Sequence, residues 1–182
     1  AVEQIENGDL CNKYNALVLW ANGWHNGIIG IVASKLKERY HMPVFLFALD
    51  ETGDTAKGSG RSVMPFNLYC ALEQMTDIIE TYGGHKDAAG AVVKKENLLK
   101  IRTMFSELVG RFLENNTFYD VMEAECYVSA SELNTSNAEQ ISLLEPFGKS
   151  NITPVFCFKD AVIENIKTTA NQKHLKLMLN CQ

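Results

Sequence analysis

The sequence predicts an α/β unit over residues 1–116 followed by a small β-rich unit over residues 117–182. In the first part, short apolar runs typical of buried strands alternate with stretches whose apolar residues recur every three or four positions, as in helices that cover a sheet. In the second part, β-rich segments follow one another at short intervals, with one short helix among them. The polar run Asn115, Asn116, Thr117 interrupts both patterns and marks the predicted boundary.

The first predicted strand is residues 16–21, ALVLWA, a short apolar run. A helix is expected from Asn26, with Asn26 itself as the N-cap. Its apolar stripe consists of residues at four-residue spacing: Ile28, Val32, Leu36 and Tyr40. Pro43 bars its continuation, so residues 44–49, VFLFAL, are predicted to be a second buried strand that ends in the polar turn 50–54.

After a Gly-rich loop at residues 58–62, a second amphipathic helix is predicted to end at Gly83 and Gly84. Its apolar positions are Leu68, Leu72, Met75, Ile79 and Tyr82. Residues 88–93 are the third predicted strand. A long helix is expected from about Lys95, with one stripe formed by Leu98, Ile101, Phe105, Leu108 and Phe112.

The second unit is predicted to be β-rich. Residues 119–128, 155–158, 162–166 and 175–179 are strand-like, and Ser136 with Glu139 forms a capping box for a short helix through Leu144. Several strands with one helix predict a small antiparallel barrel such as an OB-fold, which we expect to be cut short at Gln182.

Composition places the chain among folded proteins. The net charge is −5, with 46% hydrophobic and 21% charged residues, which excludes a disordered tail, a collagen-like chain and a coiled coil. No apolar run approaches the roughly 18 residues of a membrane helix. The chain begins without Met or a secretory signal, so we expect a fragment of a longer protein. The acidic balance argues against a nucleic-acid binder, whose footprint is usually basic.

Cysteine usage indicates a cytoplasmic protein. The five cysteines include no C-x-x-C pair, and an odd count fits neither a disulfide framework nor a zinc site. Carboxylates and histidines do not cluster at metal-ligand spacings, and no H-E-x-x-H, phosphate-binding P-loop or nucleophile elbow occurs. We therefore predict no metal site or cofactor within this chain. His41 and His174 are interpreted as surface or strand residues.

Three Gly-rich segments could carry chemistry. In residues 23–33, GWHNGIIGIVA, Trp24 and His25 stand beside the start of a helix, where backbone N–H groups attract anions, and Gly27 and Gly30 would let another backbone approach. The alternative is a capped turn with a structural Trp. In residues 58–62, GSGRS, the Arg61 fork and two hydroxyls suit a phosphate, and the alternative is a flexible turn.

The third segment is residues 83–90, GGHKDAAG. A double Gly tightens a turn, and the AAG run leaves room for another group to approach. His85 could be a neutral donor, an acid or a charge partner near physiological pH. The alternative is a solvated loop histidine.

Taken together and in this order, the three segments resemble the signature of the RecJ family, single-stranded-DNA-specific 5′→3′ exonucleases of the DHH phosphoesterase superfamily. Residues 1–116 resemble its DHHA1 domain. The later motif LEPFG-x-x-N-x-x-P-x-F at residues 144–156 resembles the opening of the OB-type domain that follows, and HLKL at residues 174–177 resembles a later strand of it. The resemblance covers nearly the whole chain.

The resemblance implies roles for individual residues. Ser59 and Arg61 match positions that hold the 5′-terminal phosphate of the DNA. His85 matches the histidine that faces the catalytic cleft and touches the scissile phosphate, and Trp24 and His25 match a motif lining that cleft. The implied nucleic-acid-binding set is Ser59, Arg61, Ser62, Trp24, His25, Gly83, Gly84 and Lys86. The implied partner is single-stranded DNA with a 5′ end, in DNA repair and recombination.

The family's metal-binding cluster lies in an N-terminal DHH domain that this sequence does not contain. Mn²⁺ or Mg²⁺ is therefore implied for the full-length enzyme, and we expect the present chain to bind DNA without cutting it. Two alternatives stay open. One is the DHHA1 region of another DHH phosphodiesterase, such as an oligoribonuclease or a cyclic-dinucleotide hydrolase, and the other is a non-catalytic scaffold related to RecJ.

Overall fold

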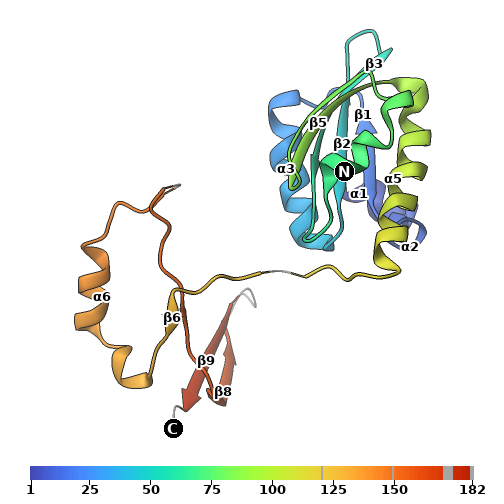
Figure 1. The fold of residues 1–182 in the computed structure, drawn as a ribbon. Coiled ribbons are helices and arrows are strands. Elements are labelled where there is room, and N and C mark those ends of the chain that lie inside the picture. The colour runs from blue at the N-terminus through green and yellow to red at the C-terminus, as the bar shows by residue number, and fades with distance from the viewer. Residues whose placement is uncertain (120, 149, 170–173, 181–182) are drawn as a thin grey trace. The chain divides into compact units, whose positions relative to one another are not determined.

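A computed structural model of the chain describes residues 1–119, 121–148, 150–169 and 174–180 (Figure 1). The chain divides into two compact units, Ala1–Val121 (unit 1) and Met122–Gln182 (unit 2). Within the described ranges, no helix is both long enough and apolar enough to cross a membrane.

Unit 1 is built on a mixed sheet with the strand order β1-β2-β3-β5-β4. Strands β1 and β2 are parallel, and all other neighbours are antiparallel. The bounds are β1 Leu17–Ala21, β2 Val44–Leu49, β3 Thr55–Arg61, β4 Thr81–Gly84 and β5 Ala88–Lys94. The predicted strands over residues 16–21, 44–49 and 88–93 are thereby confirmed.

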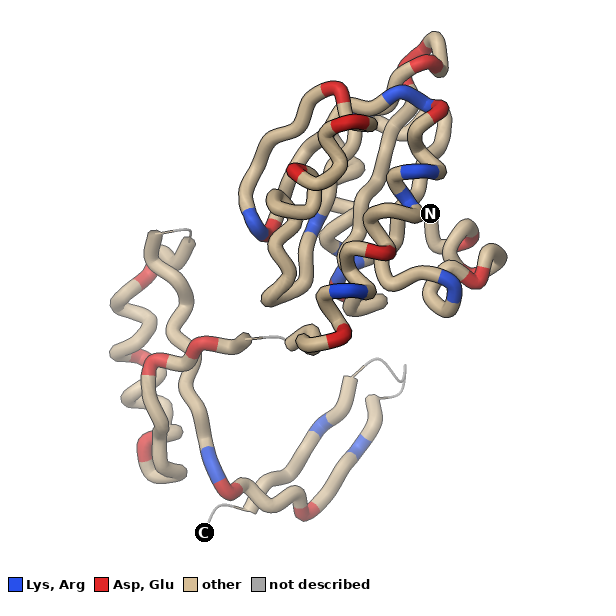
Figure 2. The backbone as a smooth tube through the Cα atoms, turned by 45° about the vertical axis from the view of Figure 1, so that its right-hand side comes forward, with Lys and Arg blue, Asp and Glu red and all other residues tan. Residues whose placement is uncertain are grey.

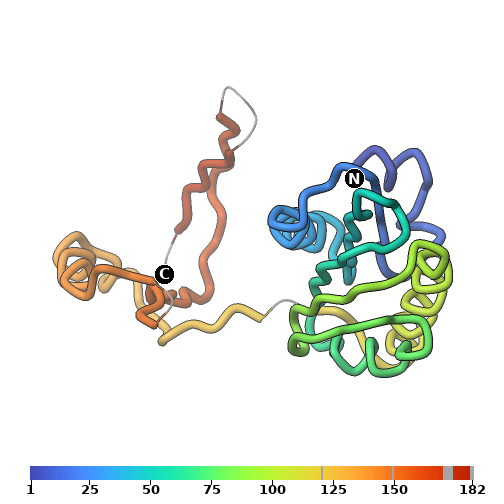
Figure 3. Tube along the Cα trace, turned by 90° about the horizontal axis from the view of Figure 1, so that it is seen from above, coloured from blue at the N-terminus to red at the C-terminus, as the bar shows by residue number. Residues whose placement is uncertain are grey.

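Helices cover both faces of this sheet, with α3 on one side and α5 on the other (Figures 1 and 3). Short 3₁₀ turns precede β4 and α5. The helical segments of unit 1 are α1 Val2–Gly8, α2 Leu10–Lys13, α3 Asn26–Tyr40, α4 Leu68–Glu73, η1 Thr76–Ile78, η2 Lys95–Asn97 and α5 Leu98–Leu113. The predicted helices from Asn26 and from about Lys95 are confirmed.

Alternation along β2 divides the core into two layers. Phe45 and Phe47 point to the side of α4 and α5, where Phe45 also contacts Phe105 of α5 edge to face. Leu46 points to the opposite layer, beneath α3. Because both faces of β2 are buried, its sequence is a continuous apolar run rather than an alternating one.

Two details predicted for α3 are wrong. The buried stripe is Ile29, Ala33 and Leu36, whereas Ile28 is 54% exposed. Both registers have helical spacing, and the contact with the sheet, which the sequence alone does not show, selects between them. The N-cap is His25 rather than Asn26, since His25 Nδ1 accepts the Gly27 N–H at 3.1 Å.

Two of the three Gly-rich segments, residues 58–62 and 83–90, lie largely in strands. Residues 58–61 lie inside β3, in the middle of the sheet, where Gly58 and Gly60 pair with Phe47 and Phe45 of β2. The predicted helix over residues 68–82 ends at Glu73, and Gly83 and Gly84 form the end of β4 instead of a helix C-cap. The apolar residues of this pattern that follow Glu73 belong to the 3₁₀ region and the edge strand β4 rather than to a helix.

Unit 2 is β-rich, as predicted. Its described elements are β6 Cys126–Tyr127, η3 Ala130–Glu132, α6 Thr135–Ser142, β7 Phe156–Cys157, β8 Val162–Thr168 and β9 Leu175–Asn180. They form two strand pairs, β6–β7 parallel and β8–β9 antiparallel. Of the predicted strand over residues 119–128, which includes residue 120 outside the described ranges, only β6 forms.

The N-cap of the short helix of unit 2 lies two residues before the predicted cap. Asn134 caps α6 by accepting the Asn137 N–H, so the predicted box of Ser136 and Glu139 does not form. A capping box does occur on the preceding 3₁₀ turn, between Ser129 and Glu132. Hydrogen bonds from the Ser129 backbone N–H and hydroxyl hold the pKa of the Glu132 carboxyl below its usual range.

Candidate functional site

Arg61, the last residue of β3, is held in place by hydrogen bonds from three of its N–H groups. Its Nε donates to Ser34 Oγ of α3 at 3.1 Å, and Nη1 donates to Ser59 Oγ at 3.1 Å and to the Gly60 carbonyl at 2.8 Å. Ser34 in turn donates to the Gly30 carbonyl one helical turn earlier. The half-buried guanidinium is therefore fixed between the helix and the sheet.

The charge of Arg61 is unpaired within the described residues, where no carboxylate lies within 4.0 Å of it. Its Nη2 makes none of the hydrogen bonds found in that part of the chain. Nη2 keeps two N–H donors, and a guanidinium with such donors and no carboxylate partner suits the oxygens of a phosphate. The arrangement can therefore accept an anion.

The antiparallel pairing places His85 in the same cross-strand row as Arg61. Arg61 pairs with Ala88 of β5, and on the other side of Ala88 the His85 N–H donates to the Ala88 carbonyl at 2.8 Å. Neighbouring strands lie about 4.8 Å apart, so the two Cα atoms are separated by about 10 Å. Two residues far apart in the sequence thus lie at one end of one sheet.

The His85 ring is open on one side. Its Nδ1 lies 3.3 Å from the Asp87 backbone N–H, which it accepts when neutral, and 3.6 Å from Asp87 Oδ2, with which it would pair when protonated. The side chain is 67% exposed. In either state Nε2 carries a proton and is free to donate to an incoming anion.

Gly84 fixes the backbone that leads into His85. Its φ is +142°, and a Cβ at this position would overlap the Ala88 carbonyl and the Ala89 backbone of the paired strand. An L side chain rarely adopts this conformation, so the close β4–β5 pairing before His85 depends on glycine. This is a structural role, distinct from the ligand contact implied by the resemblance.

Ser62 and Lys86 differ in accessibility. The Ser62 hydroxyl is buried and donates to the Phe66 carbonyl at 2.7 Å, so its donor is used within the fold. Lys86 is exposed in the turn between β4 and β5, where its carbonyl accepts the Leu68 N–H. Lys86 therefore remains a candidate for phosphate contact, and we leave the Ser62 side chain out of the proposed set.

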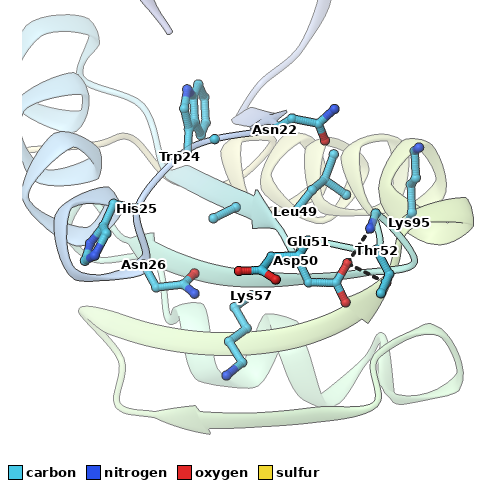
Figure 4. A pocket seen from close by; sticks show the side chains of 13 residues that line it. Asn22, Trp24, His25, Asn26, Leu49, Asp50, Glu51, Thr52, Lys57 and Lys95 are labelled. Carbon is cyan, nitrogen blue, oxygen red and sulfur yellow. Dashed lines mark hydrogen bonds between the residues drawn. The ribbon is translucent and has the colours of Figure 1, made fainter.

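Trp24 and His25 line a different hollow, of about 740 Å³, at the carboxyl ends of β1 and β2 (Figure 4). It is also lined by Asn26, the turn over residues 50–53, Lys57 and Lys95, but not by Ser59, Arg61 or His85. The Trp24 ring is half-buried and packs on the core beneath α3. Trp24 and His25 therefore line a different hollow from Arg61 and His85, whereas Gly30 of the same motif lies beside Arg61.

The turn at the edge of this hollow is organised by Asp50. Hydrogen bonds from Thr55, Thr52 and the Gly53 N–H hold the pKa of the Asp50 carboxyl below its usual range, with the Thr55 hydroxyl the main cause. The carboxylate thus serves the β2–β3 turn, and Figure 4 shows it bonded toward Thr52 and Gly53 rather than into the hollow.

Among the described residues, Lys and Arg are scattered along the backbone, with Lys94 and Lys95 adjacent to each other (Figure 2). Within the described residues, no group of three or more His, Cys, Asp or Glu could hold a metal ion. These residues do not fit the divalent metals implied by the resemblance, and we derive no metal-dependent step from them.

Sequence reasoning did not assign Ser34 to the site, and it read Gly30 only as a place where another backbone could approach. A Cβ at Gly30 would lie 3.0 Å from Arg61 Nη2 and 3.1 Å from Ser59 Oγ, so Gly30 makes room for the anion site. If residues 55–61 had been read as a strand, their alternation would have placed Lys57, Ser59 and Arg61 on one face.

Substitution Gly30→Ala should separate stability from binding. Alanine favours the helix by about 1 kcal/mol, while its methyl group pushes the Arg61 guanidinium aside by a few tenths of an ångström. We expect an unchanged or raised melting temperature together with weaker binding of a phosphate-bearing ligand, measured by calorimetric titration. Full retention of affinity would show that this contact does not position Arg61.

Two family comparisons match the chain. The DHHA1 domain family matches residues 13–111, and the RecJ OB domain matches residues 124–182. The chain is 33% identical over 180 residues to the single-stranded-DNA-specific exonuclease RecJ of Bacillus subtilis, covering 98% of this chain and 23% of that protein. It is 29% identical to RecJ of Escherichia coli, covering 97% and 32%. The chain thus spans 23% to 32% of the length of these relatives.

Solved structures of RecJ also match the chain. RecJ of Thermus thermophilus in complex with Mn²⁺ matches with a TM-score of 0.73 at 27% identity, over 98% of this chain and 27% of that one. The same enzyme in complex with Mg²⁺ matches with a TM-score of 0.71.

Proposed function

Because the chain belongs to the DHHA1 domain family, we propose that it is the nucleic-acid-binding part of a metal-dependent, single-strand-specific 5′→3′ exonuclease. The resemblance to RecJ and the order of a DHHA1 domain followed by an OB-type domain are confirmed by the matches. The observation that carries the proposal is the Arg61 guanidinium, fixed by Ser34 and Ser59 without a carboxylate partner among the described residues.

In this proposal Arg61 and Ser59 hold the 5′-terminal phosphate of the strand. A terminal phosphate carries more negative charge than an internal one and exposes an additional oxygen, so the charged Arg61 guanidinium and its free Nη2 donors favour it. A pocket that prefers such an end gives the enzyme its 5′ polarity. His85, in the same row, donates from Nε2 to the scissile phosphate.

The remaining residues of the implied set take lesser roles. Lys86 lies in the turn next to His85 and adds positive charge. Gly83 and Gly84 shape the β4 backbone beneath the DNA strand. Trp24 and His25 line the separate hollow at the start of α3, where they would meet a more distant part of the nucleic acid. Repair and recombination, which process single strands from 5′ ends, are the proposed setting of the parent enzyme.

The proposed function predicts binding without hydrolysis by this chain alone. Two-metal phosphodiester cleavage needs carboxylates that hold the ions and activate water, and the described residues provide no such group. Incubation of the purified chain with a 5′-labelled oligonucleotide and Mn²⁺ or Mg²⁺ should release no nucleotide. Metal-dependent release of nucleotide would contradict this prediction if the activity persists after repurification and co-purifies with the protein.

The predicted DNA binding is tested by fluorescence anisotropy with three oligonucleotides of the same sequence. These are a single strand with a 5′-phosphate, the same strand with a 5′-hydroxyl, and the blunt duplex. We expect affinity to fall in that order. Equal affinity for all three would overturn the proposed function.

A further inference from the structure

Lys57 lies on the same face of β3 as the proposed phosphate site. Side chains alternate along a strand, so Lys57, Ser59 and Arg61 share the α3 side of the sheet, while Ala56, Gly58 and Gly60 face the core under α4 and α5. At about 3.3 Å per residue, the Lys57 Cα is about 13 Å from that of Arg61. Two cations therefore stand at the two ends of one strand face.

The Lys57 ammonium is available to a ligand. The residue is exposed, and no carboxylate within the described residues lies within 4.0 Å of its Nζ. Figure 4 shows its side chain directed away from Asp50 and Glu51 and over the neighbouring strand. There it lines a hollow of about 320 Å³, with Thr81, Gly83, Gly90 and Val92 among the other lining residues.

This hollow lies on the open side of β5. Ala89, Ala91 and Val93 of that strand are buried in the core, whereas the alternate residues Gly90 and Val92 are partly exposed on the opposite face. The face with Lys57 is therefore the one open to a ligand.

The row between the two cations has almost no side chains. Ser59 pairs with Gly90, and Gly90 pairs with Gly83. A Cβ at Gly83 would meet nothing within 4 Å, and one at Gly90 would meet only the Gly58 carbonyl at 3.5 Å. Neither glycine has a positive φ. The fold does not require glycine at either position, although glycine within a strand costs about 0.5–1 kcal/mol.

Glycine that the fold does not need is explained by close approach of a ligand to the backbone. We infer that Lys57 binds a backbone phosphate of the same single strand, downstream of the phosphates held by Arg61 and His85, and that the intervening nucleotides cross the Gly90–Gly83 strip. This inference rests on the proposed function. It extends the site from one terminal phosphate to a track along β3.

The test compares thymidine 5′-monophosphate with 5′-phosphorylated hexathymidylate as ligands of the 182-residue chain. Lys57→Gln should weaken hexamer binding about fivefold and reduce the slope of log K against log salt by about 0.7, the contribution of one phosphate on a single strand. Its affinity for the monophosphate should be unchanged. Lys57→Arg should keep the hexamer affinity. Lys95→Gln, which removes another lysine that lines the hollow of about 740 Å³ but lies off the track, is the matched control and should change neither ligand.

The outcomes separate the two proposals. If Arg61→Ala weakens both ligands and Lys57→Gln weakens neither, the track is wrong and the terminal site stands. If Lys57→Gln weakens the monophosphate as much as the hexamer, Lys57 acts at the terminal phosphate and the inference also fails. If Arg61→Ala leaves monophosphate binding unchanged, the proposed function itself fails.

Discussion

Replacing Gly58 by alanine should lower the free energy of unfolding of unit 1 by about 2–3 kcal/mol, the usual range for an overpacked core. A Cβ at Gly58 would overlap the Phe47 ring and the Phe45 ring, which stack on each other at 4.8 Å between centroids. Both rings are almost completely buried, so neither can move aside without displacing Phe105 or its neighbours. Chemical denaturation monitored by circular dichroism measures the effect.

Gly83→Ala is the control for this prediction. It places the same methyl group in open space on β4 at an ordinary φ, so the free energy of unfolding should be unchanged or raised by up to about 1 kcal/mol. Equal stability of the Gly58 and Gly83 variants would mean that the core tolerates a side chain in the middle of β3.

Arg61→Ala should remove the preference for a 5′-phosphate. A charge-assisted pair of hydrogen bonds contributes about 2 kcal/mol, so the affinity for a 5′-phosphorylated strand should fall about thirtyfold, to that of the 5′-hydroxyl strand. The 5′-hydroxyl strand itself should bind nearly as before. Titration of both oligonucleotides against both proteins gives the four affinities needed for a thermodynamic cycle.

Two further variants test which property of Arg61 causes the loss of the preference for a 5′-phosphate. Arg61→Lys keeps the charge but not the planar fork, so it should recover only part of the preference. Ser34→Ala keeps Arg61 and removes the Nε acceptor, so it should have a smaller effect in the same direction. If Arg61→Ala still prefers the 5′-phosphorylated strand, the terminal phosphate binds at a site other than Arg61.

Most of the regular elements of unit 1 could be predicted from local patterns. The apolar run over residues 44–49 is a strand with both faces buried, and the apolar spacing from Leu98 to Phe105 describes the buried side of α5. Both patterns can be recognised locally because the side chains that become buried follow one another within the same short segment. The register of α3 could not be predicted in this way, since it depends on how Gly30 and Ser34 fit against β3.

The Gly-rich segments misled because their glycines serve distant partners. Gly58 and Gly60 make room for the rings of Phe47 and Phe45, so residues that usually indicate a loop form a central strand. Polar character in residues 58–61 likewise arises from the exposed face of that strand. Nothing within five residues of Ser59 in the sequence identifies the rings of Phe45 and Phe47 as the partners of these glycines.

The candidate residues come from sequence motifs, whereas their arrangement in space could not be predicted. Motifs pointed to Arg61 and His85, and only the pairing of β5 with both β3 and β4 brings them into one row. Trp24 and His25 line a separate hollow. The net charge of −5 at first argued against nucleic acid, whereas the proposed function needs only one guanidinium at a fixed position, without a carboxylate partner among the described residues, to hold a strand end.

The most direct test of the account is a ¹H–¹⁵N NMR titration of this chain with hexathymidylate carrying either a 5′-phosphate or a 5′-hydroxyl. With the 5′-phosphate we predict the largest shift changes at the Arg61 Nε–H and at the amides of Ser59, His85 and Ala88, and much smaller changes there with the 5′-hydroxyl. Identical spectra for the two ligands, or changes confined to residues 50–53 or to unit 2, would contradict the assignment of the 5′-phosphate to Arg61.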